Sequence, residues 1–180
     1  WTVTTAGADC VGTTPPIGTV CTDGTIYAGL SPDSAAKMFT TRCDVGQVWD
    51  GTSCTGGRSY ATWNNGTSNW TTTGYTSSTT GKSNSANLAA RVDAGSPYSA
   101  AIYCENLVQD GHSDWYLPAE DELVVLITNK DSIRNFDLSG VYYNTSTEFD
   151  GSRLRARRLS DGVWGAANKN NSLIFRCVRR

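Results

Sequence analysis

Six cysteines constrain this 180-residue chain more than any other feature of its sequence. Their number is even, no two of them form a C-x-x-C pair, and His112 is the single histidine. Zinc sites are built mainly from closely spaced cysteines and histidines, so the pattern favours a disulfide framework. Disulfides persist in oxidising compartments, which indicates a secreted or cell-surface protein. Fifteen connectivities are open to six cysteines. Among them we predict Cys10–Cys21, Cys43–Cys54 and Cys104–Cys177.

The composition excludes several classes of protein. The chain has 15 Lys+Arg against 17 Asp+Glu, a formal net charge of -2, without the basic excess of a general nucleic-acid binder. No apolar run approaches the ~18–20 residues of a membrane helix, so we expect no membrane insertion. A hydrophobic share of 38% with six Trp is too high for a disordered chain. Because the sequence begins at Trp1, we expect an upstream export signal or stalk to have been removed.

Three stretches organise what we predict to be one domain, residues 1–180. Residues 1–55 hold the cysteine-bracketed hairpins, with tight turns at Asp23-Gly24 and Asp50-Gly51. Residues 56–95 form a polar excursion whose aromatic side chains favour partial order. Residues 96–180 form the core.

Two helices are predicted within that core. Ser96 and Pro97 suit the start of the first helix, and Gly111 suits its end. The second helix has three acids at positions 120–122, where negative charge suits the helix dipole, and we expect Lys130 to close it. Strand-like pieces lie before and after the helices. This order predicts an α+β fold with two helices and short antiparallel strands.

Five short blocks carry a resemblance to a known family. They are YCENL at 103–107, GHSDWYLP at 111–118, EL at 122–123, YNTSTE at 143–148 and FRCVR at 175–179. In this order they resemble the Lcl C-terminal domain family, named for a collagen-like bacterial adhesin, whose members are similar to C-type-lectin-like folds. The match covers about residues 97–180. The earlier hairpins match some longer members less diagnostically.

The resemblance implies several further expectations. In C-type-lectin-like folds a first-helix cysteine commonly bridges to the last strand, and Cys104 and Cys177 match those places. The chain departs from the family at Ala119, where Thr is frequent, and at Asn144, where Trp is usual. Relatives often sit at the tip of a fibre and some are variable binding proteins, so the resemblance implies a bacterial adhesin, a homotrimer and recognition of host, prey or neighbouring cells.

Catalytic and metal sites find little support in the sequence. No nucleophile–base set can be assembled around His112, which we place in a polar loop. The acids Asp114 and 120–122 lack EF-hand spacing, and the lectin-type calcium motifs are absent. We therefore predict no catalytic residue, no metal and no cofactor.

The charge is divided unevenly along the chain. Residues 151–180 hold eight basic side chains against Asp161 alone, a net charge of +7, while the other 150 residues carry -9. In a strand Arg153, Arg155 and Arg157 share one face, because side chains alternate with period two. Such a stripe could grip sulfate, carboxylate or phosphate groups. The alternative is a solvated strand face paired with the acidic remainder of the domain.

A second candidate surface combines amide and aromatic side chains, which suit sugar and protein recognition. Together the two surfaces place the ligand in residues 141–171, and we predict that it is a glycan or another cell-surface ligand such as a protein. The predicted ligand-binding residues are Tyr143, Asn144, Glu148, Arg153, Arg155, Arg157, Arg158, Trp164, Asn168, Lys169 and Asn170. Two alternatives stay open: an oxidase similar to formylglycine-generating enzymes, and a purely structural fibre cap.

Overall fold

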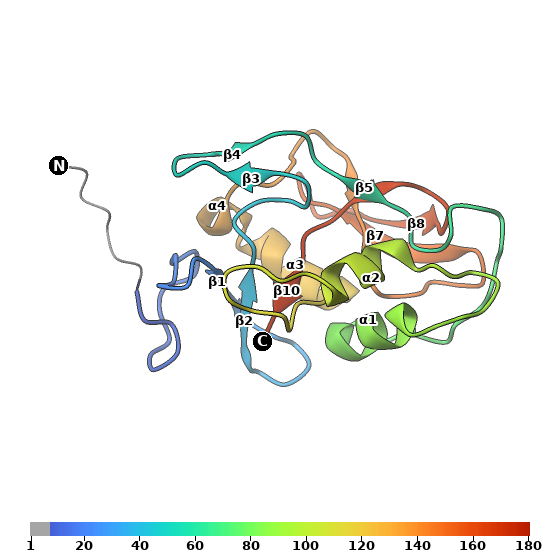
Figure 1. Ribbon diagram of the computed structural model, residues 1–180, viewed down its shortest axis with the longest axis horizontal. Coiled ribbons are helices and arrows are strands. Elements are labelled where there is room, and N and C mark those ends of the chain that lie inside the picture. The colour runs from blue at the N-terminus through green and yellow to red at the C-terminus, as the bar shows by residue number, and fades with distance from the viewer. Residues whose placement is uncertain (1–7) are drawn as a thin grey trace.

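Strands, then helices, then strands follow one another in the computed structural model, which describes residues 8–180 (Figure 1). The first strands are β1 (Ile26–Leu30), β2 (Lys37–Thr40), β3 (Val48–Trp49), β4 (Cys54–Thr55) and β5 (Tyr60–Ala61). The helices are α1 (Gly81–Ala89), α2 (Ser99–Glu105), α3 (Glu120–Thr128) and α4 (Lys130–Ile133). The last strands are β6 (Tyr142–Tyr143), β7 (Arg153–Arg158), β8 (Trp164–Asn168), β9 (Leu173–Ile174) and β10 (Val178–Arg179). The predicted α+β class is confirmed.

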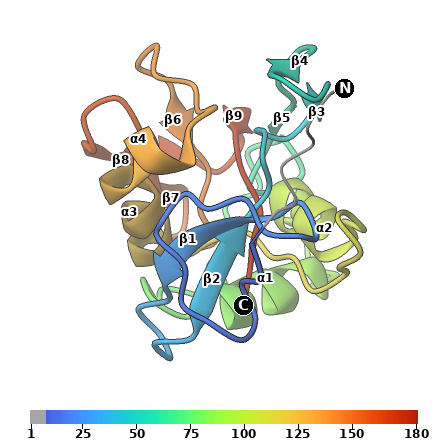
Figure 2. The same ribbon diagram turned by 90° about the vertical axis from the view of Figure 1, so that its left-hand side faces the viewer.

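The described strands form three sheets. β1, β2 and β10 make an antiparallel three-stranded sheet, and β3 and β4 make a separate hairpin (Figure 2). The third sheet has the order β5-β9-β6-β7-β8 and is antiparallel except where β6 runs parallel to β9. Because β10 pairs with β2, the end of the chain joins the sheet formed by its beginning.

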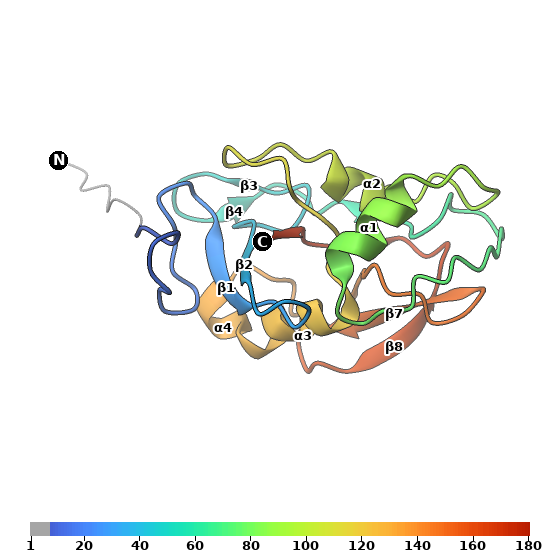
Figure 3. The same cartoon turned by 90° about the horizontal axis from the view of Figure 1, so that it is seen from below.

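Two large buried clusters lie between these elements, and a small third one surrounds the Cys10–Cys21 bridge. Figure 3 shows α1 and α2 on one side of the molecule, and α3 with β7 and β8 on the other. The first cluster packs Leu88 of α1 and Cys104 of α2 against Trp63 and Phe175. The second packs Leu123 and its neighbours on α3 against side chains of β1, β2 and β6. The segment that leads to β10 therefore runs through the middle of the core.

All three predicted disulfides are confirmed. Cys10–Cys21 and Cys43–Cys54 close the two N-terminal loops, and Cys104–Cys177 joins α2 to the residue before β10. No cysteine is left free. The last bridge encloses about 74 residues, and the chain-entropy model gives such a bridge a stabilisation of roughly 4 kcal/mol.

The predicted limits of the first helix are wrong at both ends. α2 begins at Ser99, after a cis Ser96–Pro97 bond, and it ends at Glu105. Ser96 does not cap it, because Tyr98 holds the N-cap position; the Ser96 hydroxyl donates instead to the carbonyl of Arg91 at 3.0 Å. Gly111 does have a positive φ, but it belongs to a separate tight turn after the helix.

The prediction of only two helices is also wrong, because α1 and α4 lie in stretches without an apolar stripe. Leu88 is the one large apolar side chain of α1. Polar contacts hold the rest of this helix: Ser85 Oγ accepts from the backbone N–H of Leu117 at 3.0 Å, and Asn84 donates to the carbonyl of Ser77 at 2.7 Å. The second predicted helix matches α3, but Lys130 begins α4 instead of ending α3.

The polar excursion is tied to the core through Trp63. This side chain is 1% exposed, and its indole N–H donates to the carbonyl of Thr145 at 2.9 Å. Trp70 differs, since it is 42% exposed. Within residues 8–180, the helices are all too short or too polar to cross a bilayer.

Candidate functional site

The structure divides the eleven predicted ligand-binding residues between the core and the surface. Four are buried, each at most 2% exposed: Tyr143, Asn144, Glu148 and Lys169. These four predictions are wrong as surface contacts, because each side chain is occupied by the interior of the protein. The other seven lie on or beside β7 and β8: Arg153, Arg155, Arg157, Arg158, Trp164, Asn168 and Asn170.

Lys169 and Glu148 form a buried ion pair. The Lys169 Nζ lies 2.5 Å from Oε1 of Glu148 and also donates to the carbonyls of Thr71 and Gly151. The Glu148 carboxylate accepts from the backbone N–H groups of residues 73–74 at 2.8 and 2.7 Å. Burial lowers the pKa of Lys169, and the neighbouring carboxylate opposes that shift. The pair fastens the polar excursion to the end of β8.

Asp44 collects a second buried cluster. Its Oδ1 accepts from Arg176 Nε at 2.9 Å, and its Oδ2 accepts from the Tyr143 hydroxyl and from Arg58 Nε at 2.7 Å each. Burial raises the pKa of Tyr143, and the Asp44 charge adds to that shift. Burial lowers the pKa of Arg176, which Asp44 opposes. Arg176 therefore belongs to the interior of the protein.

Asn144 occupies the interior position where the resembling family usually has Trp. Its Nδ2 donates to the carbonyl of Ala61 at 3.2 Å. Its Oδ1 has no partner among the described residues. The Asn144 amide therefore faces the core.

The arginine stripe is confirmed as one face of β7. In the antiparallel register Arg153 lies opposite Asn168, and Arg157 lies opposite Trp164, so these side chains share a face. Leu154 and Ala156, whose side chains point to the opposite face of the strand, are buried. The face thus combines arginines from β7 with Trp164 from β8.

Two carboxylates pair with the three arginines of this stripe. Glu120, at the start of α3, is 4% exposed and lies 3.3 Å from Arg155 Nε and 2.8 Å from a terminal nitrogen of Arg157. Arg153 pairs with Asp150 at 2.5 Å. The solvated and paired strand face, weighed above as the alternative, describes these arginines better than a free anion site.

The same pairing extends over the whole basic C-terminal segment. All eight basic residues of 151–180 have a carboxylate within salt-bridge distance, and seven of the eight pair with a carboxylate outside the segment. The charge of +7 is therefore set against the acidic body of the domain, rather than gathered into one exposed patch.

Stacking remains available on this surface, which we call the β7–β8 face: Phe149, Arg153, Arg155 and Trp164. The Arg155 guanidinium lies 5.1 Å from the ring centroid of Phe149 and 5.3 Å from that of Trp164. Arg153 lies 4.8 Å from the Phe149 centroid. Trp164 is 47% exposed. The four side chains form a partly exposed surface whose members contact one another.

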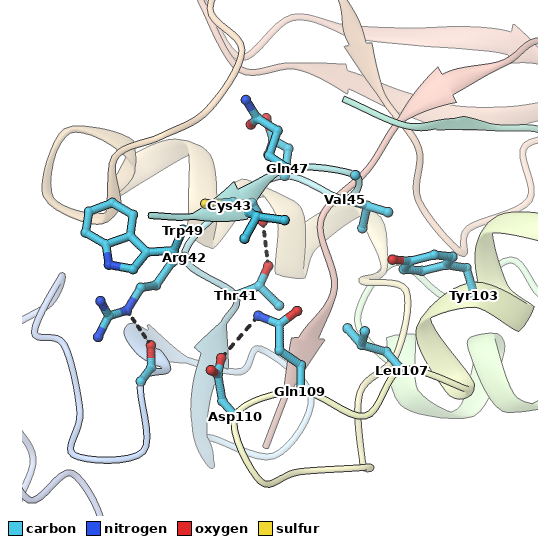
Figure 4. Close-up of a pocket in the computed structure, with 14 residues that line it drawn as sticks. Thr41, Arg42, Cys43, Val45, Gln47, Trp49, Tyr103, Leu107, Gln109 and Asp110 are labelled. Carbon is cyan, nitrogen blue, oxygen red and sulfur yellow. Dashed lines mark hydrogen bonds between the residues drawn. The ribbon is translucent and has the colours of Figure 1, made fainter. Parts of the chain in front are cut away.

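A cavity of about 380 Å³ was not foreseen from the sequence (Figure 4). Its walls come from Gly24, from residues 41–49, which lead from β2 into β3, and from residues between 103 and 110, in the last turn of α2 and the chain after it. Trp49 and Arg42 lie on one side of it, and Tyr103 lies on the other. We call it the Arg42 cavity. The one sequence signal near it was the Asp50-Gly51 turn, which indicated a hairpin but gave no reason to expect a cavity.

Arg42 and Trp49 form a stacked pair at its edge. The guanidinium carbon lies 5.2 Å from the Trp49 ring centroid, and Arg42 Nε donates to the carbonyl of Gly24 at 2.8 Å. Both side chains also line a second cavity of about 460 Å³, bordered by residues 17–20 and 132–135. The pair therefore separates two neighbouring hollows.

Metal-ligating side chains do not gather in the part of the chain that the structure describes. Between residues 8 and 180 no three or more His, Cys, Asp or Glu side chains are placed to share an ion. His112 Nε2 lies 2.9 Å from Oδ2 of Asp23, in a contact between two turns.

Glu122 is fully buried and accepts from the Tyr116 hydroxyl at 2.8 Å, while burial raises its pKa.

Comparison with known proteins adds no relative. A scan against protein-family models matches no family, and a search of curated proteins finds no similar sequence. The resemblance to the Lcl C-terminal domain family accordingly stays a hypothesis that rests on the motifs quoted above.

Proposed function

We propose that this protein is an extracellular recognition domain that binds glycans or other cell-surface ligands through the β7–β8 face. The observation that carries the proposal is the stacked arrangement of Phe149, Arg155 and Trp164. The rings of Phe149 and Trp164 lie 5.8 Å apart between centroids, and the Arg155 guanidinium carbon lies 5.1 and 5.3 Å from them, beside both rings. Such a surface is ordered before a ligand arrives, which lowers the entropic cost of binding.

The chemistry of this face suits a ligand with flat apolar patches and hydroxyl groups. Trp164 offers an exposed ring for stacking. Asn168 is exposed at the end of the same strand and can both donate and accept hydrogen bonds. Because Glu120 pairs with both Arg155 and Arg157 and offsets one of their two charges, binding here depends on stacking and hydrogen bonds more than on net charge.

The three disulfides support an extracellular location, because such bridges persist in oxidising compartments. They also favour recognition over the oxidase alternative, because that chemistry uses reactive cysteines and all six here are paired. The family resemblance adds display at the tip of a bacterial fibre and assembly into a homotrimer. Both belong to the proposal.

The test is a glycan array probed with the native, disulfide-intact protein. We expect Trp164→Ala and Arg155→Ala to weaken binding about tenfold or more, since stacked aromatic contacts at interfaces are worth about 1–3 kcal/mol. Trp70→Ala is the matched control, because Trp70 is exposed to a similar extent at 42% and lies outside the face. Equal binding by all variants would contradict the proposal and favour a structural fibre cap.

A further inference from the structure

We propose that the outer edge of β8 pairs with β8 of a second copy of this chain, so that two domains share one continuous sheet. The contact goes beyond the function proposed above and does not depend on what the β7–β8 face binds. β8 is the last strand in the order β5-β9-β6-β7-β8, and its only neighbour in that sheet is β7. Figure 3 shows β8 at the outer rim of the molecule. None of its five residues is buried.

The register of β7 and β8 turns part of the β8 backbone outward. The backbone N–H of Lys169 donates to the carbonyl of Ser152 at 3.0 Å, and that of Arg158 donates to the carbonyl of Val163 at 2.9 Å. These bonds mark the hydrogen-bonded pairs of the ladder, which alternate with pairs whose N–H and C=O groups point away from the partner strand. The residues of β8 in pairs of the second kind are Trp164, Ala166 and Asn168. Their backbone groups therefore face the open edge.

These outward groups are almost all without a partner. The backbone N–H and C=O groups of Trp164 and Ala166 have no hydrogen bond on the outer side of β8 within residues 8–180. The Asn168 carbonyl accepts one bond, from the backbone N–H of Asn171 at 2.9 Å, and its own N–H has none in the same part of the chain. Unpaired edge groups are a template for another strand. β8 also lacks the usual protection, since it has no charged residue, no proline and no shift in register.

The edges of the other described sheets are covered or short. Along β1, the backbone N–H of Gly18 donates to the carbonyl of Tyr27 at 2.8 Å, and the N–H of Tyr27 donates to the carbonyl of Thr19 at 3.0 Å. Along β10, Tyr116 and Val178 exchange backbone hydrogen bonds at 2.8 and 3.1 Å. The strands β3, β4 and β5 have two residues each. In the described part of the chain, β8 is thus the longest edge that is left open.

β8 is complementary to itself when two copies run antiparallel about a two-fold axis at Ala166. In this arrangement Ala166 lies opposite Ala166 of the second copy, and Trp164 lies opposite Asn168 of the second copy, so all five residues pair. The outward groups then form roughly six hydrogen bonds across the axis. Only small side chains meet at the axis itself. No like charges lie opposite one another in the two strands, because β8 carries none.

The arginines of β7 do not oppose this pairing. Two intervening β8 strands hold the arginines of the two copies about 14 Å apart, at the usual spacing between strands. This separation exceeds the screening length of about 8–10 Å at ordinary salt concentrations. Carboxylates of the same copy also pair with these arginines.

A second copy also adds to the β7–β8 face. Because residues that lie opposite one another in adjacent strands share a face, the two faces lie on the same side of the joint sheet. Asn168 of the second copy then lies beside the exposed ring of Trp164. Such a two-fold contact closes on itself as a dimer. It is therefore a different contact from the homotrimer that the family resemblance implies.

The experiment is sedimentation equilibrium of the native, disulfide-intact protein from about 10 µM to about 1 mM. We expect a monomer–dimer equilibrium with a dissociation constant of about 0.1 mM, because one pair of short strands gives a small interface. ¹H–¹⁵N NMR spectra over the same range locate the contact. The backbone N–H signals of Ala166 and Asn168 should shift with concentration, and that of Ala167, which faces β7, should shift less.

Substitutions at the axis test the register. Ala166→Pro removes one outward N–H, a change that edge strands tolerate, and it should raise the dissociation constant about tenfold or more. Ala166→Thr keeps the N–H and is the matched control. Ala166→Glu and Ala166→Lys each place like charges opposite one another, so each variant alone should be a monomer. An equimolar mixture of these two should dimerise again, within about threefold of the native dissociation constant.

The backbone spectrum of each variant reports whether it folds. The proposal is overturned if the native chain stays a monomer at about 1 mM. It is also overturned if the native chain forms only a trimer, or if folded Ala166→Pro associates as the native chain does. A monomer whose Ala166 signal shifts only when an extended peptide of alternating threonine and valine is added would assign the edge to a foreign strand, against self-pairing. The glycan array does not enter this test, so the two proposals can fail separately.

Discussion

One basic segment supplies two very different regions of this molecule. Lys169 and Arg176 are each 1% exposed and sit in tightly bonded pockets of carboxylates and carbonyls. Arg153 and Arg155 come from the same segment, but they lie at the surface, stacked on Phe149. Both groups pair with carboxylates. The two groups differ in their exposure to water: the first is buried, and the second is partly solvated.

Burial changes what an ion pair contributes. Desolvation of a buried charge costs several kcal/mol, so loss of one partner leaves the other strongly destabilised. An exposed pair is worth about 0–1 kcal/mol, because water screens and replaces it. The net charge of a segment therefore does not locate a binding site. The buried cations hold the fold, and only the exposed ones are free to meet a ligand.

The largest effect should come from breaking the Asp44 cluster. Arg176→Met removes the cation that pairs with Asp44 and donates to the carbonyls of Arg134 and Asn135. We expect the free energy of unfolding to fall by about 3–5 kcal/mol, as measured by denaturant titration. Arg153→Met is the matched surface control. A loss below about 1 kcal/mol for Arg176→Met would remove the proposed distinction.

Alkaline pH should weaken the buried region next. Burial raises the pKa of Tyr143, and burial with the Asp93 hydrogen bond raises that of Tyr98 to about 12. A tyrosine whose pKa is raised on folding gives stability that is fully present below its unfolded value of about 10 and is lost at higher pH. We expect the unfolding free energy to fall from about pH 10 upward, with a smaller slope in Tyr143→Phe. The exposed Tyr103 provides the control: Tyr103→Phe should leave the slope unchanged, and an equal slope in all three proteins would contradict the assignment.

Changes in the β7–β8 face should reduce ligand binding strongly and the free energy of unfolding only slightly. Trp164→Ala removes the contacts with Phe149 and Arg155, and an aromatic pair of this kind contributes about 0.5–1.5 kcal/mol. We therefore expect a loss of about 1 kcal/mol in unfolding free energy together with the loss of array binding. A loss of stability comparable to that of Arg176→Met would show that Trp164 belongs to the core.

Salt should have the smallest effect. Raising the ionic strength from about 0.05 to about 0.5 M screens exposed pairs such as Arg153–Asp150 and Arg158–Asp161. We expect the unfolding free energy to change by less than about 1 kcal/mol. Ligand binding at the β7–β8 face should likewise weaken only slightly. A steep loss of binding with salt would instead favour the arginine stripe of β7 as an anion-binding site.

Local sequence signals predicted the parts of the fold that depend on local chemistry. The spacing of the cysteines, the acids at the start of α3 and the period-two arginines of β7 all led to features that the structure contains. α1 escaped prediction because its stability comes from Ser85, Asn84 and one leucine, and these give no periodic apolar pattern.

Burial of polar residues could not be predicted from the sequence. Lys169 stands among asparagines and reads as part of a turn, but its partner Glu148 lies 21 residues earlier in the chain. Likewise, the Arg42 cavity needs Gly24, the loop after β2 and the segment after α2 to meet. Such contacts form only when segments distant in the sequence pack together. The sequence therefore does not show which of several similar side chains are buried and which are exposed.

The most direct test of the division into buried and exposed cations compares Lys169→Met with Arg155→Met. Both variants are measured for unfolding free energy and for array binding. We expect Lys169→Met to lose about 3–5 kcal/mol of stability, because Glu148 is left buried without its cation, and to bind normally while folded. Arg155→Met should lose less than about 1 kcal/mol of stability and most of its binding. Equal losses of stability in the two variants, or unchanged binding in Arg155→Met, would contradict the account.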